Sequence, residues 1–371
     1  MINNLRLKTI LGNFKIKDHT LAYEDFIART FNMCIDEGME YGKIVPSRAF
    51  CSDESQGFPI ILITKHFSAF PFDHGLVGGI MAKGRNGAYA HHAQDLVIFQ
   101  ASHVGYDKDT DHFGTYRRLQ TSDCHHSSNC GQVQATLDWY QQEYAFACDS
   151  TLLQCIDNEY YITIDKLLLN QEYDEGLFLQ LSKLIATKKG KRQDPINILS
   201  TAKVFPASTA LIDFLKEQNY QWSEKKPEAI GEYLKPDLFY FKKTLTNDNH
   251  VEKNLFQFMP WIVTSNEPML SAAEVNVQIE FDKSYRSIVR EPEYQQRNLI
   301  YIAGLNIDIS PTNGQLFSET QFVPWAAYVQ NKDGSHYILE QDELYQRLLN
   351  SSSDNPHVTD MNEALLETST D

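Results

Sequence analysis

The sequence predicts an α/β fold, in which a largely parallel β-sheet is flanked by helices, over about the first half of the chain. Between roughly residues 20 and 185, helix-like and strand-like hydrophobic patterns alternate, as they do in proteins with parallel sheets. The run from Leu96 to Phe99 is apolar without alternation, which is typical of a strand covered on both faces. The chain has 371 residues, of which 42% are hydrophobic and 12% aromatic, so it can build a sizeable core.

The first expected element is a helix over residues 20–38. Ile27, Phe31 and Ile35 recur at helical spacing and therefore share one face. Gly38 follows them as a stop signal.

Four further segments complete the expected α/β pattern. Residues 59–67 read PIILITKHF and fit either a buried strand or the start of a helix. The glycine-rich segment 74–80 fits a strand or a turn packed closely against another backbone. A buried strand over residues 95–101 and an amphipathic helix over residues 131–147 follow.

The texture of the sequence changes after the basic stretch 187–195, which we expect to be a surface loop or linker. Beyond it, segments 276–281, 298–309 and 321–330 alternate between apolar and polar residues and are β-rich. Pro324 would place the last of these strands at a sheet edge.

These textures predict three regions. The α/β domain covers residues 1–190, and a β-rich mixed region with an antiparallel sheet covers residues 196–345. Residues 350–371 contain five acids and no Lys or Arg, so we expect a disordered acidic tail.

Charge and composition restrict the partners and the compartment. The formal net charge of −16 argues against nucleic acid. No apolar run approaches the roughly 20 residues needed to cross a bilayer, so we expect no membrane partner. The N-terminal segment lacks the apolar core and the cleavage site of a secretory signal, which favours the cytoplasm. The six cysteines are then expected to be reduced.

Reactive side chains follow the expected strand ends and a helix start. His103 comes directly after the strand at 95–101, and Cys51 follows a short apolar stretch that could finish another strand. Cys130 precedes the helix at 131–147, where backbone N–H groups and the positive end of the helix dipole stabilise a thiolate, the form that binds metal. Together these residues make a plausible Cys2His zinc set with the fourth tetrahedral position open for water.

The spacing of these three residues fits no compact zinc module, so other interpretations stay open. The two cysteines could belong to the core, with His103 as a hydrogen-bonded surface histidine. Cys124, which is followed by His125 and His126, competes with Cys130 as a ligand.

Four local stretches resemble the limiting-CO2-inducible B/C family of β-type carbonic anhydrases, close to those called theta-class. They read, in order, AFCSDES, HHAQDLVIFQASHVGYD, FGTYRRLQ and SSNCG, and they lie within about residues 40–150. The resemblance implies a β-carbonic-anhydrase-like domain that is commonly dimeric. It also implies that Cys51, His103 and Cys130 are the zinc ligands. Asp53 would be the carboxylate beside the metal.

One position departs from the pattern that this resemblance implies. β-carbonic anhydrases read Cys-x-Asp-x-Arg, whereas Ser55 stands at the arginine position here. The arginine that holds Asp53 must therefore come from elsewhere. Arg118 is the first candidate, with Arg85 and Arg117 as alternatives.

The resemblance implies a carbonate dehydratase, a zinc lyase that reversibly hydrates CO2 to bicarbonate. Zinc lowers the pKa of bound water from about 16 to about 7 in the best case. Asp53 would orient the reacting oxygen, and Arg118 would keep Asp53 ionised. The expected partners are CO2, bicarbonate and a second copy of the chain in a homodimer, and no ligand is expected from beyond residue 200.

Two other functions remain possible on the sequence alone. The first is a non-catalytic zinc-binding or bicarbonate-binding module of the same fold that assembles with partners. The second is a hydrolase in which Cys51 or Cys130 acts as the nucleophile with a histidine base.

Overall fold

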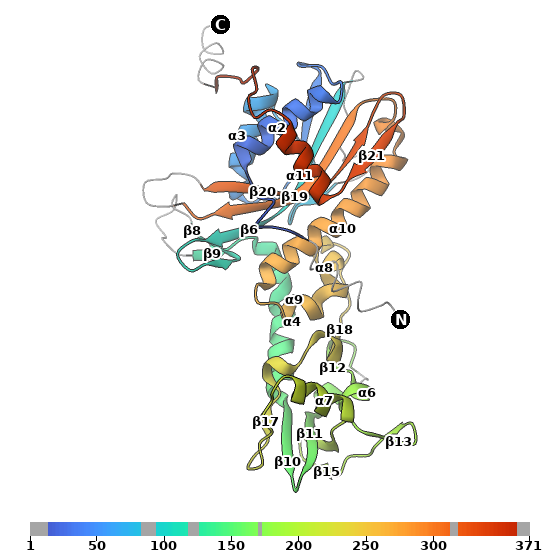
Figure 1. Ribbon diagram of the computed structural model, residues 1–371. Helices are drawn as coiled ribbons and strands as arrows, with labels where there is room; N and C mark the ends of the chain where they lie inside the picture. Colours follow the sequence, from blue (N-terminus) through green and yellow to red (C-terminus); the bar gives the residue numbers. More distant parts are fainter. Residues whose placement is uncertain (1–13, 83–93, 118–125, 170–172, 312–317, 362–371) are drawn as a thin grey trace. The chain divides into compact units, whose positions relative to one another are not determined.

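The computed structural model describes residues 14–82, 94–117, 126–169, 173–311 and 318–361 (Figure 1). The chain forms two compact units. The first combines residues 1–134 with residues 269–371, and the second consists of residues 135–268. Within the described ranges, no helix has the length and apolar character that crossing a membrane requires.

The first unit is built on an eight-stranded sheet with the order β1-β20-β19-β6-β2-β3, in which β21 pairs with β20 and β7 with β6. Its strands are β1 (Leu21–Ala22), β2 (Ile44–Ala49), β3 (Phe72–Asp73), β6 (Asp95–Asp107), β7 (His112–Phe113), β19 (Leu299–Ile309), β20 (Glu319–Gln330) and β21 (His336–Leu339). Strand β6 is parallel to β2 and β19, whereas β20 is antiparallel to β19. The structure is therefore mixed α/β with a partly parallel central sheet, as expected in outline.

The two central strands are buried along almost their whole length. Every residue of β19 is buried, and β6 has one partly exposed residue, Tyr106. This explains why the sequence of β6 is apolar from Leu96 to Phe99 without alternation. The expected strand at 95–101 is confirmed, but it continues to Asp107 because β19 pairs with it as far as Tyr106. His103 thus lies within a strand and not beyond its end.

Helices cover both faces of this sheet. They are α2 (Tyr23–Asp36), α3 (Gly57–Phe67), α10 (Pro268–Arg290) and α11 (Gln341–Asn350). Ile300 and Ile302 of β19 belong to the core shared with α2, α3 and α11. Tyr301 points to the opposite face, where its ring stacks on Phe281 of α10 at 5.3 Å. Figure 1 shows α2, α3 and α11 grouped beside the sheet.

The expected helix at 20–38 is confirmed as α2, and segment 59–67 proves to be the helix α3. Segment 74–80 forms most of a small hairpin made by β4 (Gly75–Leu76) and β5 (Ile80–Met81).

The strand expected at 276–281 is wrong, because this segment lies in the middle of helix α10. Val277, Ile279 and Phe281 alternate in sequence, but only Val277 and Phe281 are buried. Ala273 extends their stripe at four-residue spacing, which is the helical period. Six residues were too short a window to distinguish the two periods.

Pro324 lies in a strand, as expected, but β20 is not the outermost strand. The pairing of β19 with β20 shifts register between Ala303 and Gly304, and Gly304 faces Pro324. On the other side, β1 pairs with positions 321–322 of β20 and β21 with positions 327–330. Pro324 therefore falls between the two short outer strands, where no ladder hydrogen bond needs its nitrogen.

The second unit contains a five-stranded antiparallel sheet with the order β15-β16-β11-β10-β17 and a separate pair, β12 with β18. Its strands are β10 (Thr151–Ile156), β11 (Glu159–Asp165), β12 (Gly176–Leu179), β13 (Thr187–Lys188), β14 (Lys191–Arg192), β15 (Asn197–Ile198), β16 (Ala202–Pro206), β17 (Glu228–Ala229) and β18 (Phe239–Lys242). Its helices are α4 (Gly131–Ser150), α5 (Lys166–Leu169), α6 (Leu181–Leu184), α7 (Thr209–Glu217), α8 (His250–Leu255) and α9 (Met259–Val263). Helix α4 begins in the first unit and confirms the helix expected at 131–147.

The boundaries between the two units, after residues 134 and 268, differ from the boundary that the sequence predicted. The boundary expected between residues 190 and 196 lies inside the second unit, where the basic stretch forms the exposed hairpin β13–β14. Strands β19 and β20 share a sheet with β6 instead of forming a separate C-terminal region. The physical reason is that β6 is almost entirely buried, so the backbone N–H and C=O groups along both of its edges need paired strands.

The tail expected to be disordered over residues 350–371 is in part packed on the first unit. The side-chain amide of Asn32 donates hydrogen bonds to the carbonyl oxygens of Ser352 and Asp354, at 2.7 and 3.0 Å. The Thr359 amide donates to the Lys65 carbonyl at 2.9 Å. Residues 362–371 lie outside the described part of the chain.

Candidate metal centre

The structure brings the three predicted zinc ligands together. One potential ligand atom from each of Cys51, His103 and Cys130 lies within 4.8 Å of the others. All three residues are buried, with at most 3% of their surface exposed. The two sulfur atoms are 3.7 Å apart. Two sulfurs and one imidazole nitrogen at this spacing could hold a metal ion.

Each ligand is placed by the element beside it. Strands β2 and β6 are parallel neighbours, with Ala49 opposite Gln100, so Cys51 and His103 lie toward the carboxyl ends of adjacent strands. Ligands commonly bind at that edge of an α/β sheet. Cys130 directly precedes α4 and is brought in by the backbone of Asn129, whose carbonyl accepts from the Gly105 amide at 3.0 Å.

The close approach at Gly105 requires a glycine. A β-carbon at this position would lie 2.5 Å from the carbonyl oxygen of Thr115, which is a severe clash. Thr115 belongs to β8 (Thr115–Arg117), which pairs with β9 (His126–Ser128) just before Cys130. Gly105 therefore lets the pair β8–β9 lie against β6, which places Cys130, just after β9, in the cluster.

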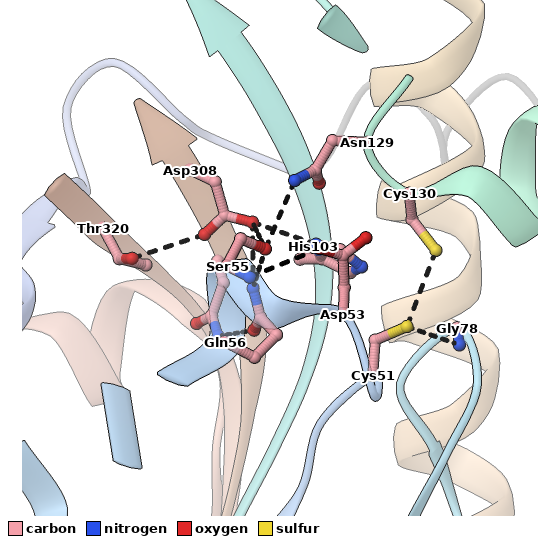
Figure 2. Close-up of polar contacts among 11 residues, drawn as sticks. Cys51, Asp53, Ser55, Gln56, Gly78, His103, Asn129, Cys130, Asp308 and Thr320 are labelled. Carbon is pink, nitrogen blue, oxygen red and sulfur yellow. Dashed lines mark hydrogen bonds and ion pairs between the residues drawn. The ribbon is translucent and has the colours of Figure 1, made fainter. Parts of the chain in front are cut away.

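The two ring nitrogens of His103 have different surroundings. Its Nδ1 atom lies 2.9 Å from Oδ2 of Asp308, and both side chains are fully buried (Figure 2). Its Nε2 atom has no hydrogen-bond partner in the described part of the chain. A buried ring nitrogen that lacks a partner and belongs to the same cluster as two cysteine sulfurs fits a metal ligand.

Asp308 is surrounded by hydrogen-bond donors. Its Oδ2 accepts from Ser55 Oγ at 2.8 Å and from Gln56 Nε2 at 2.9 Å, in addition to His103. Its Oδ1 accepts from Thr320 Oγ1 at 3.3 Å. Figure 2 shows these side chains converging on the carboxylate, which lies on the far side of His103 from the sulfurs.

The electrostatics of the cluster favour one thiolate in the absence of metal. Hydrogen bonds from Cys130 and from His103 together lower the pKa of Cys51 to about 4, against the effect of burial. The hydrogen bond between the two cysteines, together with burial, raises the pKa of Cys130 to about 12. Burial alone would lower the pKa of His103, but Asp308 and the two cysteines raise it well above its usual value.

The hairpin β4–β5 supports Cys51. The Gly78 amide donates to Cys51 Sγ at 3.2 Å. The Gly78 carbonyl in turn accepts from Asn276 of α10 at 3.0 Å. Gly79 has a positive φ of 74°, and a β-carbon there would lie 2.1 Å from the Ala101 carbonyl oxygen. The two glycines thus allow the hairpin to lie against β6 beside the cluster.

Asp53 lies close to the cluster in sequence and is partly exposed. Its Oδ1 accepts from the Ser55 amide at 3.3 Å, which caps the short 3-10 helix Glu54–Gln56. Over the described ranges, Asp53 forms no ion pair with an arginine. The guanidinium of Arg117 instead donates to the Pro311 carbonyl at 2.7 Å.

Several predicted residues lie outside the described part of the chain. These are Arg118, the first candidate partner of Asp53, its alternative Arg85, and Cys124, the competing ligand. Their assignments stay predictions.

The sequence analysis missed Asp308, Thr320 and Asn129, which form the polar surroundings of His103 and Cys130. A signal for Asp308 was present in the sequence NIDIS, where Asn306 and Asp308 interrupt a strand that is otherwise apolar. Polar residues on a strand buried on both faces need buried partners. That signal indicates a polar site but not which residues Asp308 contacts.

The fold and the cluster together define a mixed α/β protein with a buried Cys-His-Cys candidate metal centre. No protein-family profile matches the chain, and no curated protein sequence matches it. Among solved structures it is similar to PtLCIB4, a homolog of the limiting CO2-inducible protein LCIB. The identity is 11%, the TM-score is 0.50, and the match covers 91% of this chain and 99% of PtLCIB4.

A histidine-to-alanine mutant of PtLCIB4 gives a similar match. The identity is 10% and the TM-score is 0.51, and the match covers 90% of this chain and 96% of the mutant. At such low identity the similarity shows a shared fold. The structural match covers both compact units and not only residues 40–150, where the family-like motifs lie.

Proposed function

We propose that this protein is a zinc-dependent carbonic anhydrase that reversibly hydrates CO2 to bicarbonate. The observation that carries the proposal is the buried cluster of Cys51, His103 and Cys130, in which the imidazole Nε2 has no hydrogen-bond partner among the described residues. The similarity of the fold to a homolog of a limiting CO2-inducible protein supports the choice of substrate.

The donor set suits zinc. Two thiolates and one neutral imidazole are common zinc ligands, and three protein ligands are the number found at catalytic zinc sites. Cys51, His103 and Cys130 would hold the ion, and a zinc ion there would supply an acidified water as the nucleophile that CO2 hydration needs. The three candidate ligand side chains are buried, and electrostatic interactions are strong in such surroundings.

The other residues of the site have separate roles in this proposal. Asp53 lies two residues after Cys51, and its carboxylate can accept a hydrogen bond from the reacting oxygen and orient it. Asp308 holds His103, and the Gly78 amide donates to Cys51. Arg118 is proposed as the partner of Asp53.

The direct test is CO2 hydration measured by stopped flow on protein loaded with zinc. Turnover should exceed the uncatalysed rate and should disappear in a His103→Ala variant. Absence of turnover from protein that carries one zinc per chain would reject the proposed activity.

One observation favours a second function, a non-catalytic zinc-binding or bicarbonate-binding module of the same fold. Ser55 stands where β-carbonic anhydrases carry an arginine, and its hydroxyl is directed to Asp308 and not to Asp53. A protein of this kind would hold zinc and bind bicarbonate in a calorimetric titration without hydrating CO2. The proposed homodimer is tested separately, by analytical ultracentrifugation.

A further inference from the structure

Oδ2 of Asp308 lies 2.9 Å from Nδ1 of His103, the imidazole member of the candidate metal cluster. Asp308 lies on β19, 205 residues after His103 in the chain. Its side chain is fully buried. Burying a carboxylate is costly unless hydrogen bonds satisfy it, so this position demands an explanation.

All four groups around Asp308 can donate a hydrogen bond. Oδ2 lies within 2.9 Å of Ser55 Oγ, Gln56 Nε2 and His103 Nδ1, and Oδ1 lies 3.3 Å from Thr320 Oγ1. An ionised carboxylate accepts at both oxygens and can satisfy all of them. An amide of the same shape would accept at only one end and would present an N–H group to at least one donor.

Three of the four donors belong to segments that carry the proposed metal ligands, and the fourth, Thr320, lies on β20. Ser55 and Gln56 form the short helix that follows Cys51. Asn129 precedes Cys130, and its side-chain amide donates to Ser55 Oγ at 3.2 Å. One carboxylate is thus linked to His103 directly, to the Cys51 segment directly and to the Cys130 segment through Ser55.

The contact with Asp308 also selects the tautomer of His103. An ionised carboxylate accepts hydrogen bonds only, so Nδ1 must carry the proton. In the neutral ring the lone pair is then on Nε2, which has no hydrogen-bond partner among the described residues. Carboxylates in this position fix the orientation of a metal-binding histidine and increase its basicity.

We propose that Asp308 is the positioning residue of the metal centre. It keeps the lone pair of His103 Nε2 available to the ion and holds the three ligand-bearing segments together before the ion binds. The inference rests on the proposed metal site and not on CO2 turnover. It also assigns to the C-terminal strand β19 a part in building a site whose ligands all come from the first 130 residues.

The test compares Asp308→Asn with Asp95→Asn in the full-length protein. Asp95 is a buried carboxylate at the start of β6, paired with Lys332 at 3.2 Å and with the amide of Asn298 at 3.1 Å. The probe is Co²⁺, whose thiolate charge-transfer and ligand-field absorption report both affinity and geometry. Asp308→Asn should weaken cobalt binding about 10- to 100-fold and change the ligand-field spectrum. Asp95→Asn should leave both unchanged.

Cobalt affinity and a spectrum equal to wild type in a folded Asp308→Asn variant would overturn the proposal. If that variant does not fold, the nitrogen NMR spectrum of His103 in zinc-loaded wild-type protein shows which ring nitrogen carries the proton. A proton on Nδ1 is expected, and a proton on Nε2 with Nδ1 on the metal would overturn the proposal. If the Asp308 variant shows these effects but the zinc-loaded wild-type protein hydrates no CO2, the proposed activity is rejected and the role of Asp308 is kept.

Discussion

Cys51 and Cys130 are 79 residues apart in the chain, yet their sulfur atoms lie 3.7 Å apart in the buried cluster with His103. This pair has no disulfide, and both residues are free cysteines. Two buried sulfurs at this distance repel one another if both are ionised and no cation lies between them. The pair is therefore suited either to share a proton or to hold a metal ion.

The first prediction concerns metal content. Wild-type protein should bind about one zinc ion per chain, and Cys51→Ser or Cys130→Ser should remove it, because a hydroxyl is a poor replacement for a thiolate ligand. Cys34→Ser is the matched control, since Cys34 is also buried and free but packs in the core with α2 and α3. Elemental analysis of the purified variants measures the zinc. Stoichiometric zinc in both ligand variants would show that the metal binds elsewhere.

The second prediction concerns the ionisation of the metal-free protein. The hydrogen bonds from Cys130 and from His103 lower the pKa of Cys51 to about 4, so one thiolate should form as the pH rises through the mildly acidic range. Cys130, whose pKa is raised to about 12, should remain protonated at neutral pH. Thiolate absorbance in the ultraviolet measures this titration.

In the Cys51→Ser variant the thiolate signal of the acidic range should disappear. A wild-type protein whose first thiolate forms only near the ordinary cysteine value of 9.0 would contradict the geometry of the pair.

The third prediction separates metal binding from turnover. Asp53→Asn should keep zinc but lose CO2 hydration by about a hundredfold or more, because the amide cannot serve as the same proton acceptor. Asp73→Asn is the control, since the Asp73 carboxylate is exposed and forms an ion pair with Arg48 at 2.7 Å. Stopped-flow rates at equal zinc content provide the comparison. A full rate in Asp53→Asn would remove Asp53 from the mechanism.

The fourth prediction concerns the two compact units. Replacing residues 135–268 by a short flexible linker should leave a folded first unit that still binds one zinc ion. The two ends to be joined are close, because the Asn129 amide donates to the Gly114 carbonyl at 3.1 Å and Gly114 packs directly against Met269.

The contrasting fragment ends at residue 190. It contains all three proposed ligands but lacks β19 and β20, so one edge and part of both faces of β6 would be exposed. We expect it to be insoluble or unable to bind zinc. Zinc binding and solubility of the two fragments are the measurements, and a stable zinc-binding 1–190 fragment would contradict the assignment of β19 to the site.

Local sequence predicted several elements and the three members of the cluster. The helical period identified α2 and α4, an apolar run identified β6, and a β-rich alternating pattern identified β19, because these signals come from residues that are neighbours in the chain. Cys51, His103 and Cys130 were selected by their places beside such elements and by their resemblance to a family pattern. The structure brings the same three residues together.

Tertiary structure alone decided which distant segments meet. The segment around Val277 alternates like a strand, and only its burial within a long helix shows the stripe that continues through Ala273. Asp308 reaches His103 because β19 pairs in parallel with β6, and no local pattern encodes which strand becomes the neighbour of another. The sequence therefore determined most of the element types and which side chains are candidate ligands. The sheet order, set by the burial of β6 on both sides, determined that a carboxylate from the C-terminal part of the chain holds the histidine.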